Sequence, residues 1–434
     1  MSRLLERWSS GLTGESSGIA DRFIRVFSVD VLVKGSGILL LPLYLALMTQ
    51  EEYATFNYLT AVIGVLALVF NFGLYIPQSK LVHDVSEAER GSLLLTINLL
   101  LAGLLLLCLL PTYLFGWDAR LIKFVFSDQI IYENYIYLIP IGVTAAVVSQ
   151  MTLNYFLTRE LISRVQRYNL SRLVLGTGLT LGALYWMAGD RAELRLTASL
   201  LAEFAALAIF LPTYLGAMRG RFNRVFARQS LTLGLPIMVS AALGIVINFG
   251  DKYFIEKFCS LADMSVYFLG LAFANVITVV FMAFQNVWLP LFLKEKDLTL
   301  NISKTRKMAK NLLLGFSLLA VTIWLAVAGA FAVGILNQAY IQVLGLLPIL
   351  MIASICSSLV GLLSVYTVYW GMTHMTIVIG IAVAAVSVPL NFLAARDHGT
   401  VGIAVVSVLL HLLYVAAYLA FIRFRIKSLA SSSN

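Results

Sequence analysis

The chain has 434 residues, of which 60% are apolar and only 12% are charged, whereas soluble proteins carry about 25% charged residues. A single water-soluble core could not bury this much apolar side chain, so most of the apolar surface must face lipid. The net charge of +9 comes mostly from Lys and Arg in the loops, so no nucleic-acid partner is expected. Cys108, Cys259 and Cys356 lie far apart, without a paired Cys or His at metal-ligand spacing. No disulfide, metal site or cofactor is therefore expected.

Apolar stretches long enough to cross a membrane recur along the whole chain. A bilayer core of about 30 Å requires about 20 apolar residues in a helix. Continuous apolar runs favour helices over barrel strands, which would alternate in polarity. Twelve stretches qualify, and they cover 26–48, 53–76, 92–115, 133–157, 168–188, 195–217, 230–255, 264–290, 309–332, 341–369, 373–395 and 399–422. The predicted fold class is an all-α integral membrane protein with about twelve transmembrane helices.

Lys and Arg are distributed unevenly between alternate loops, and this distribution predicts the orientation. With the N-terminus inside, the inner segments carry 22 Lys and Arg residues and the outer loops carry 7, counting Arg195 and Lys252 at outer span ends, while Lys34 and Arg172 lie within spans. Cytoplasmic loops carry the excess of positive charge. We therefore expect a multi-pass protein with both termini in the cytoplasm, whose basic loops contact anionic membrane lipids.

A weak internal repeat divides the predicted helices into two sets of six. TQEEYATFNYLTAVIG, from Thr49, aligns with SLADMSVYFLGLAFAN, from Ser260, at an offset of 211 residues, close to half the chain. The alignment places Glu52 on Asp263, and parallel repeats of this kind occur in several transporter folds. The expected organisation, with a pseudo-twofold relation between the lobes, is an N-terminal six-helix lobe (1–217), a basic cytoplasmic linker (218–229) and a C-terminal six-helix lobe (230–434).

Three segments carry a resemblance to a known family. They are LLLPLYLALMTQEEYATFNYLTAV, which joins the first two spans, INFGDKYFIEKF at the end of the seventh, and VPLNFLAARDHGTVGIAVVSVL, which joins the last two. In this combination the chain resembles the polysaccharide-export flippases (Wzx-type) of the multidrug/oligosaccharidyl-lipid/polysaccharide exporter superfamily. The resemblance covers nearly the whole chain. It departs at Lys252, where relatives often have Arg, so no exact role is carried over to this residue.

The resemblance implies an exporter with two lobes around a central cavity. Such a protein would move undecaprenyl-diphosphate-linked oligosaccharide repeat units from the inner to the outer leaflet of the bacterial cytoplasmic membrane by alternating access. The glycan would then become O-antigen, capsule or exopolysaccharide. The partners expected on this basis are the lipid-linked oligosaccharide, membrane lipids, a coupling proton or cation, and a polysaccharide polymerase.

Asp30 and Lys34 place one charge of each sign within the first apolar stretch. A charged residue at the middle of a span costs about 2.5–3.5 kcal/mol on insertion scales, so such residues usually face a bundle interior or a wet cavity. The two residues share a helix face at i and i+4. In the first interpretation they pair with each other, or both extend their charged ends to the inner headgroups. In the second interpretation they line the cavity. In the second case Lys34 would bind the diphosphate or an acidic sugar and Asp30 would hold or release it.

Four further charged residues lie in or near spans. Arg172 suits a phosphate because of its fork of donors, although it could equally anchor the helix at the inner interface. Glu203 is either a proton or cation site or the partner of a Lys or Arg. Asp251 and Lys252 stand at the outer end of the seventh span, either as a solvated helix end or as a gate at the cavity mouth.

Uncharged polar side chains also recur inside the spans. Each could line a sugar path, but interhelical hydrogen bonding is the more common role of such residues in membranes. His411 is the one mid-span histidine, and a packing role is favoured over a proton site. The other residues of this set are Asn71, Gln150, Asn154, Asn248, Asn275, Gln285 and Asn286.

No catalytic motif appears, and the short loops leave little room for a catalytic domain, so the chain is not expected to be an enzyme. Transport energy would then come from an ion gradient or from the substrate's own gradient. The alternative function is an ion-coupled drug or cation antiporter of the same superfamily, which would favour acidic residues in its cavity. A membrane-embedded polymerase or glycosyltransferase would usually require a large loop or a cytoplasmic domain.

Overall fold

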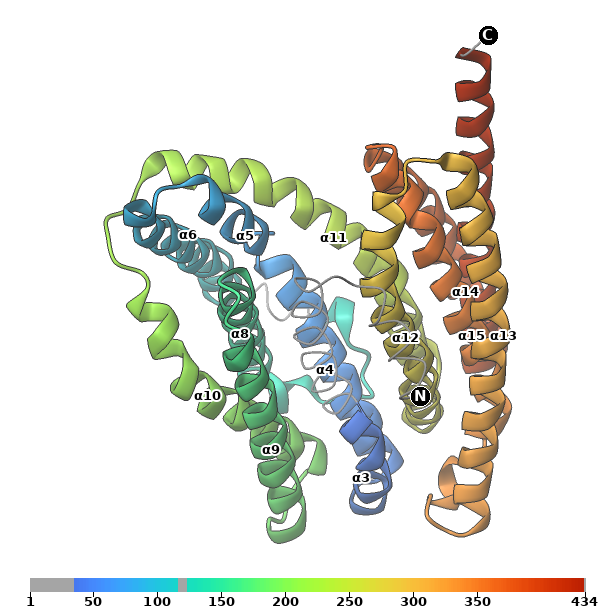
Figure 1. The fold of residues 1–434 in the computed structure, drawn as a ribbon. Coiled ribbons are helices and arrows are strands. Elements are labelled where there is room, and N and C mark those ends of the chain that lie inside the picture. Colours follow the sequence, from blue (N-terminus) through green and yellow to red (C-terminus); the bar gives the residue numbers. More distant parts are fainter. Residues whose placement is uncertain (1–34, 116–122, 433–434) are drawn as a thin grey trace.

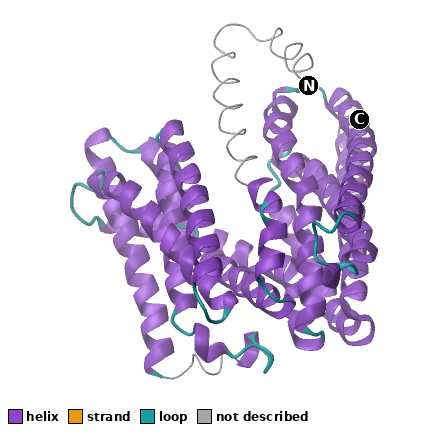
Figure 2. Cartoon of the chain, turned by 90° about the horizontal axis from the view of Figure 1, so that it is seen from below, coloured by secondary structure: helices purple, strands orange, loops and turns teal. Residues whose placement is uncertain are grey.

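The computed structural model describes residues 35–115 and 123–432, in which helices and loops occur but no strand (Figure 1, Figure 2). This confirms the predicted all-α class. The elements are α3 (Leu41–Leu47), α4 (Gln50–Phe70), α5 (Tyr75–Asp84), α6 (Glu87–Leu114), η1 (Tyr132–Tyr135), α8 (Leu138–Thr158), α9 (Ile162–Trp186), α10 (Arg191–Gly216), α11 (Arg224–Phe258), α12 (Leu261–Lys294), α13 (Leu298–Ala332), η2 (Gln338–Tyr340), α14 (Val343–Tyr369) and α15 (His374–Ser432).

The helices account for the predicted spans. In the described part of the chain, nine helical segments are long and apolar enough to cross a membrane. The last segment contains two predicted spans, because Gly399 has φ 59° and ψ −145° and breaks α15 at that point. Helix α9 is more polar, but its 25 residues reach about 37 Å. Together with the first stretch, described only from residue 35, these elements agree with about twelve transmembrane helices.

One boundary differs from the sequence-based expectation. The second span was predicted over 53–76, but α4 ends at Phe70 and a turn separates it from α5. The Asn71 side chain accepts a hydrogen bond from the backbone N–H of Gly73 at 2.7 Å, and Gly73 has φ 67°. A Cβ at Gly73 would lie 2.2 Å from the carbonyl oxygen of Gly234 on α11. Glycine thus permits α11 to cross the turn closely.

Side-chain caps fix where several helices begin. Thr49 accepts a hydrogen bond from the Glu52 N–H at 3.2 Å, and the Glu52 carboxylate accepts one from the Thr49 N–H at 2.8 Å. This is a capping box at the start of α4. Ser260 accepts from the Asp263 N–H at 3.1 Å at the start of α12. The residues aligned by the internal repeat therefore make the same helix-capping hydrogen bond.

The helices lie in two groups joined by α11 (Figure 1). In the first group, α4 packs against α8 and α10, and α9 packs against α10. In the second, α14 packs against α12, α13 and α15. Helix α11 begins against α5 and α6, crosses to the second group and packs there against α15. Helices α4 and α12 contact each other where the groups meet.

Candidate substrate and coupling sites

Asp30 and Lys34 lie outside the described residues, so their expected pairing and their expected role in a cavity stay predictions. The described part of the same stretch starts at Gly35 and continues into α3, which has Pro42 in its first turn. Proline is tolerated there because the first turn has no intrahelical partner for its backbone N–H.

Arg172 on α9 and Glu203 on α10 form an ion pair between the Arg172 Nε and the Glu203 Oε2. The Glu203 side chain is only 8% exposed, whereas that of Arg172 is 53% exposed. The Tyr168 hydroxyl donates to Glu203 Oε1 at 2.9 Å and is itself bonded to Ser149 at 2.6 Å. Glu203 therefore has both a cation and a hydroxyl donor, while half of the Arg172 side chain stays accessible for another anion.

Removing the charge of Arg172 and removing the charge of Glu203 are expected to lower stability by different amounts. Arg172→Gln leaves a buried carboxylate without its cation, which costs about 3–5 kcal/mol in a fully buried pair and less here because Arg172 is half exposed. Glu203→Gln leaves a cation whose side chain is half exposed and therefore less enclosed by protein. We therefore expect Arg172→Gln to lower the midpoint of thermal unfolding in detergent more than Glu203→Gln does.

The matched control for this comparison is Arg167→Gln, because Arg167 lies on the same helix and is exposed. It should leave the unfolding midpoint unchanged. Equal midpoints for Arg172→Gln and Arg167→Gln would show that the ion pair contributes nothing to folding.

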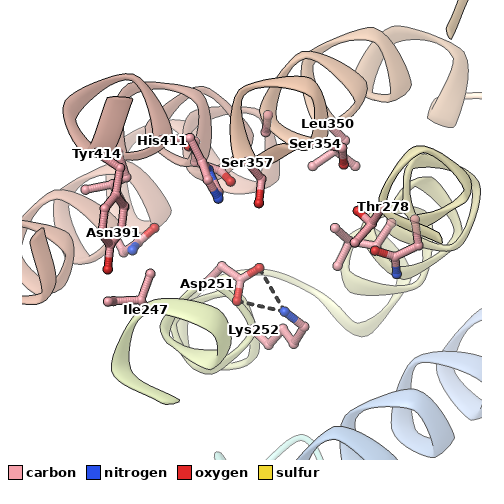
Figure 3. A pocket seen from close by; sticks show the side chains of 15 residues that line it. Ile247, Asp251, Lys252, Thr278, Leu350, Ser354, Ser357, Asn391, His411 and Tyr414 are labelled. Carbon is pink, nitrogen blue, oxygen red and sulfur yellow. Dashed lines mark hydrogen bonds and ion pairs between the residues drawn. The ribbon is translucent and has the colours of Figure 1, made fainter. Parts of the chain in front are cut away.

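The second charged pair lines a cavity of about 280 Å³ between α11, α12, α14 and α15 (Figure 3). Lys252 Nζ lies 2.9 and 3.0 Å from the two carboxylate oxygens of Asp251. The Tyr267 hydroxyl donates to Asp251 Oδ2 at 2.8 Å. The side chains of Asp251 and Lys252 are 14% and 19% exposed, so this pair is not a solvated helix end. It is an ion pair inside the second group of helices.

The rest of this cavity is lined by many polar side chains. His411 lines the wall opposite the pair (Figure 3), and its Nδ1 is 2.7 Å from the Ser407 carbonyl oxygen. Asn391 donates to Ser387 at 3.0 Å. The other polar lining residues are Asn275, Thr278, Ser354, Ser357, Ser407 and Tyr414. Since Asp251 and Lys252 balance each other, the cavity offers many hydrogen-bonding groups and little net charge.

Most of the polar residues expected within spans join helices instead. Asn71 donates to Gln150 at 3.2 Å, between the end of α4 and α8. Asn154 donates to the Tyr75 carbonyl at 2.9 Å, between α8 and α5, and Gln285 donates to the Gly361 carbonyl at 3.2 Å, between α12 and α14. Interhelical hydrogen bonding, the favoured interpretation, therefore describes these contacts. Asn275 differs because it lines the cavity.

The two groups of helices are joined at one end of the bundle, which we name the Gln50 end. Gln50 donates to the Ala339 carbonyl at 2.9 Å, and the ring of Tyr53 meets that of Tyr340 edge to face at 6.1 Å. Tyr58 stacks on Phe249, with ring centroids 5.8 Å apart. Gln50, Tyr53 and Tyr58 belong to α4, whereas their partners follow α10 in the chain. At this end the first half of the chain is therefore closed against the second.

Glu256 strengthens the same junction. Its Oε1 accepts hydrogen bonds from the backbone N–H and the hydroxyl of Ser127, both at 2.6 Å. Gln129 donates to the carbonyls of Glu256 and Cys259 at 3.2 and 3.0 Å. Glu256 follows the apolar stretch 230–255, and its burial raises the pKa of its carboxyl, although the Ser127 hydrogen bonds act in the opposite direction. The segment before η1 thus reaches across to the end of α11.

Two buried charged residues, Glu256 and Arg195, carry no sequence signal of their burial. Glu256 lies within INFGDKYFIEKF, but a glutamate at a helix end gives no signal that it will be buried. Arg195 was counted among the outer-loop cations, yet it is only 9% exposed. Its guanidinium lies over two aromatic rings from α3 and α4. No spacing within α10 could reveal these partners, because they come from other helices.

Comparison with known structures places this fold among membrane transporters. The lipid II flippase MurJ in an inward closed conformation aligns with a TM-score of 0.69 at 12% identity, over 92% of this chain and 87% of MurJ. An inward-facing multidrug resistance MATE transporter of the MOP superfamily gives 0.63 at 14%, over 94% and 96%. A variant of the Vibrio cholerae MATE transporter VcmN gives 0.59 at 15%, over 94% and 98%. At these identities the likeness concerns the fold.

Comparison of sequences shows the family. No curated protein matches the chain. The profile of the family described as "Polysaccharide biosynthesis protein" matches residues 19–295, which is more than half of the chain and runs from before α3 to the end of α12. The expected relation to a polysaccharide-related family is thereby confirmed, and the fold agrees with the exporter fold that the sequence predicted. The chain belongs to the polysaccharide biosynthesis protein family.

Proposed function

We propose that the protein is a flippase that moves undecaprenyl-diphosphate-linked oligosaccharide repeat units from the inner to the outer leaflet for cell-surface polysaccharide assembly. The observation that carries this proposal is the match to the polysaccharide biosynthesis family over residues 19–295, in a chain with the fold of membrane transporters. A protein built mainly of membrane helices contributes most directly to polysaccharide synthesis by carrying a membrane-bound intermediate across.

The distribution of Lys and Arg supports an orientation in the bacterial cytoplasmic membrane. In this orientation both termini lie in the cytoplasm and the Gln50 end faces outward. The halves 1–217 and 230–434 would act as two lobes around the substrate, with 218–229 as the linker. Contacts at the Gln50 end then correspond to a state that is closed toward the outside, as alternating access requires for one half of its cycle.

Residue roles follow from charge and accessibility. The half-exposed guanidinium of Arg172, with Lys34 and Asp30, would bind the diphosphate or acidic sugars of the substrate. Glu203 would hold Arg172 in place, and both Glu203 and the Asp251–Lys252 pair are candidates for coupling transport to a proton or another cation. A polysaccharide polymerase would receive the flipped repeat units.

An ion-coupled drug or cation antiporter is the alternative, favoured by the similar fold of MATE transporters. The two functions differ in what accumulates when the gene is deleted from its host. A flippase predicts loss of surface polysaccharide and accumulation of single lipid-linked repeat units on the inner leaflet, measured by radiolabelling lipid-linked glycans. Unchanged surface polysaccharide together with new sensitivity to cationic dyes would instead identify the antiporter.

Lys34 can be tested against a matched lysine in the same lobe. Lys34→Ala is expected to reduce flipping of a lipid-diphosphate glycan in liposomes at least tenfold, since it removes a cation within the first predicted span that would contact the anion. Lys80 on α5 is exposed and Lys80→Ala should retain activity. Equal flipping by the two variants at equal reconstitution would remove Lys34 from the site.

A further inference from the structure

Arg195 on α10 is a buried arginine held by aromatic rings. Its guanidinium carbon lies over the Tyr44 ring, 3.7 Å from the ring centroid, and over the Phe56 ring, 3.9 Å from the ring centroid. The Tyr53 centroid lies 5.9 Å away. Cation–π contacts of this kind hold the guanidinium in place and do not use its N–H donors in hydrogen bonds.

The edge of this guanidinium lacks a suitable acceptor. Among the described residues Arg195 forms no ion pair, and its one hydrogen-bond acceptor is the Met48 sulfur at 3.5 Å. A thioether is a weak acceptor, and a guanidinium carries five N–H donors. The nearby Glu52 carboxylate already accepts from the N–H groups of Thr49 and Arg191. Arg195 is therefore an oriented cation whose charge no carboxylate in the described structure balances.

A second unsatisfied group faces this arrangement from the other half of the chain. The Tyr340 hydroxyl is buried and has no hydrogen-bond partner among the described residues. The ring of Tyr340 packs edge to face on Tyr53, next to the Gln50–Ala339 hydrogen bond. Closure of the Gln50 end thus buries the Tyr340 hydroxyl and brings Tyr340 within electrostatic range of Arg195, whose ring contacts all come from the first half. Both groups would gain partners if the two halves separated here.

We propose that Arg195 is an anion-binding residue for a phosphate group on a lipid, which becomes accessible when the Gln50 end opens. This proposal rests on the proposed function, because the phosphate would be that of the lipid-linked substrate. A stacked arginine fits phosphate oxygens with two parallel N–H donors. A ligand that binds only the open state shifts the equilibrium toward that state. Arrival of the diphosphate at the outer face would thereby hold the Gln50 end open.

The test measures opening directly and does not depend on flipping. Cys108, Cys259 and Cys356 are replaced by Ala, and Gln50→Cys is labelled with a maleimide that cannot cross membranes. We expect undecaprenyl diphosphate in the liposomes to accelerate labelling about fivefold or more, and Arg195→Gln to abolish this acceleration. Arg195→Lys, which keeps the charge and loses the fork, should retain only part of it. Arg396→Gln is the control, since Arg396 is exposed and paired with Asp397.

Tyr340→Phe provides a second variant that keeps the ring and its packing. It removes the unsatisfied hydroxyl, so labelling without ligand should slow about fivefold, while the response to undecaprenyl diphosphate persists.

Acceleration that survives in Arg195→Gln would overturn the proposal, as would a wild-type protein that does not respond. Equal acceleration by phosphatidylglycerol or inorganic pyrophosphate would assign the site to any phosphate group and overturn its link to the substrate. Flipping by the wild type, measured in the same liposomes, tests the proposed function separately.

Discussion

Cross-linking residue 50 to residue 339 is expected to reduce the rate of flipping at least tenfold. The Gln50 side chain donates to the Ala339 carbonyl at 2.9 Å, so the pair Gln50→Cys and Ala339→Cys lies within reach of a short bifunctional thiol reagent. If alternating access requires the Gln50 end to open, a covalent bridge there holds the protein in one state. Flipping is measured in liposomes before the bridge, after it, and after cleavage of a reducible cross-linker, which should restore activity.

The same chemistry applied between the linker and helix α6, on which the linker packs, serves as the control. The Arg221 N–H donates to the Ser92 hydroxyl at 3.2 Å, and this contact fastens the segment before α11 to α6. A bridge between Ser92→Cys and Arg221→Cys should leave flipping intact, because both positions would move together. Full transport by protein that is completely cross-linked at 50 and 339 would show that the Gln50 end stays closed throughout the cycle.

The expected effect is large because several contacts close this end together. The Tyr53–Tyr340 pair, the Tyr58–Phe249 stack and the Ser127–Glu256 hydrogen bonds act in parallel. Removing one of them weakens closure by about 1 kcal/mol, which the others tolerate. A covalent bridge acts in the opposite direction and cannot be compensated by the remaining contacts. Cross-linking is therefore a sharper test of opening than any single deletion.

The helix count could be predicted from the sequence because lipid imposes a length and a composition on each span. Even the break at Gly399 agrees with the predicted separation of the last two spans. The pairing of Arg172 with Glu203 could not be predicted in the same way. The partners lie on different helices, and periodicity fixes a face within one helix without identifying the helix packed against it. The sequence therefore leaves two roles open for Glu203, an ion site or the partner of a cation.

Burial was also harder to predict for charges near helix ends. Asp251 and Lys252 could have been solvated, and Arg195 looked like a loop cation. In the structure the first two line a cavity and the third lies under aromatic rings. Hydropathy averages over a window of residues, so it cannot separate a charge that ends a span from one that neighbouring helices enclose. Contacts between helices decide this, and they depend on the tertiary fold.

The Asp251–Lys252 pair carries the other large expected effect. Asp251→Asn should reduce flipping at least tenfold, because it removes the carboxylate that forms an ion pair with the Lys252 ammonium, whose side chain is only 19% exposed. Part of that loss would be structural, so the double variant Asp251→Asn with Lys252→Gln is needed. It removes both charges and should restore membrane abundance, since a neutral pair leaves no buried charge unpaired.

The double variant separates a structural pair from a coupling pair. If Asp251 carries the coupling proton or cation, the neutral pair folds but still fails to respond to an imposed ion gradient across the liposome. If the charges only hold α11 in place, abundance and flipping recover together, and the coupling role is excluded. Asp397→Asn is the matched control, because Asp397 forms the same adjacent-residue ion pair with Arg396 while its side chain is 46% exposed. An exposed pair contributes about 0–1 kcal/mol, so this variant should transport like the wild type, and any deficit of the Asp251 variants beyond it measures what enclosure in the cavity adds.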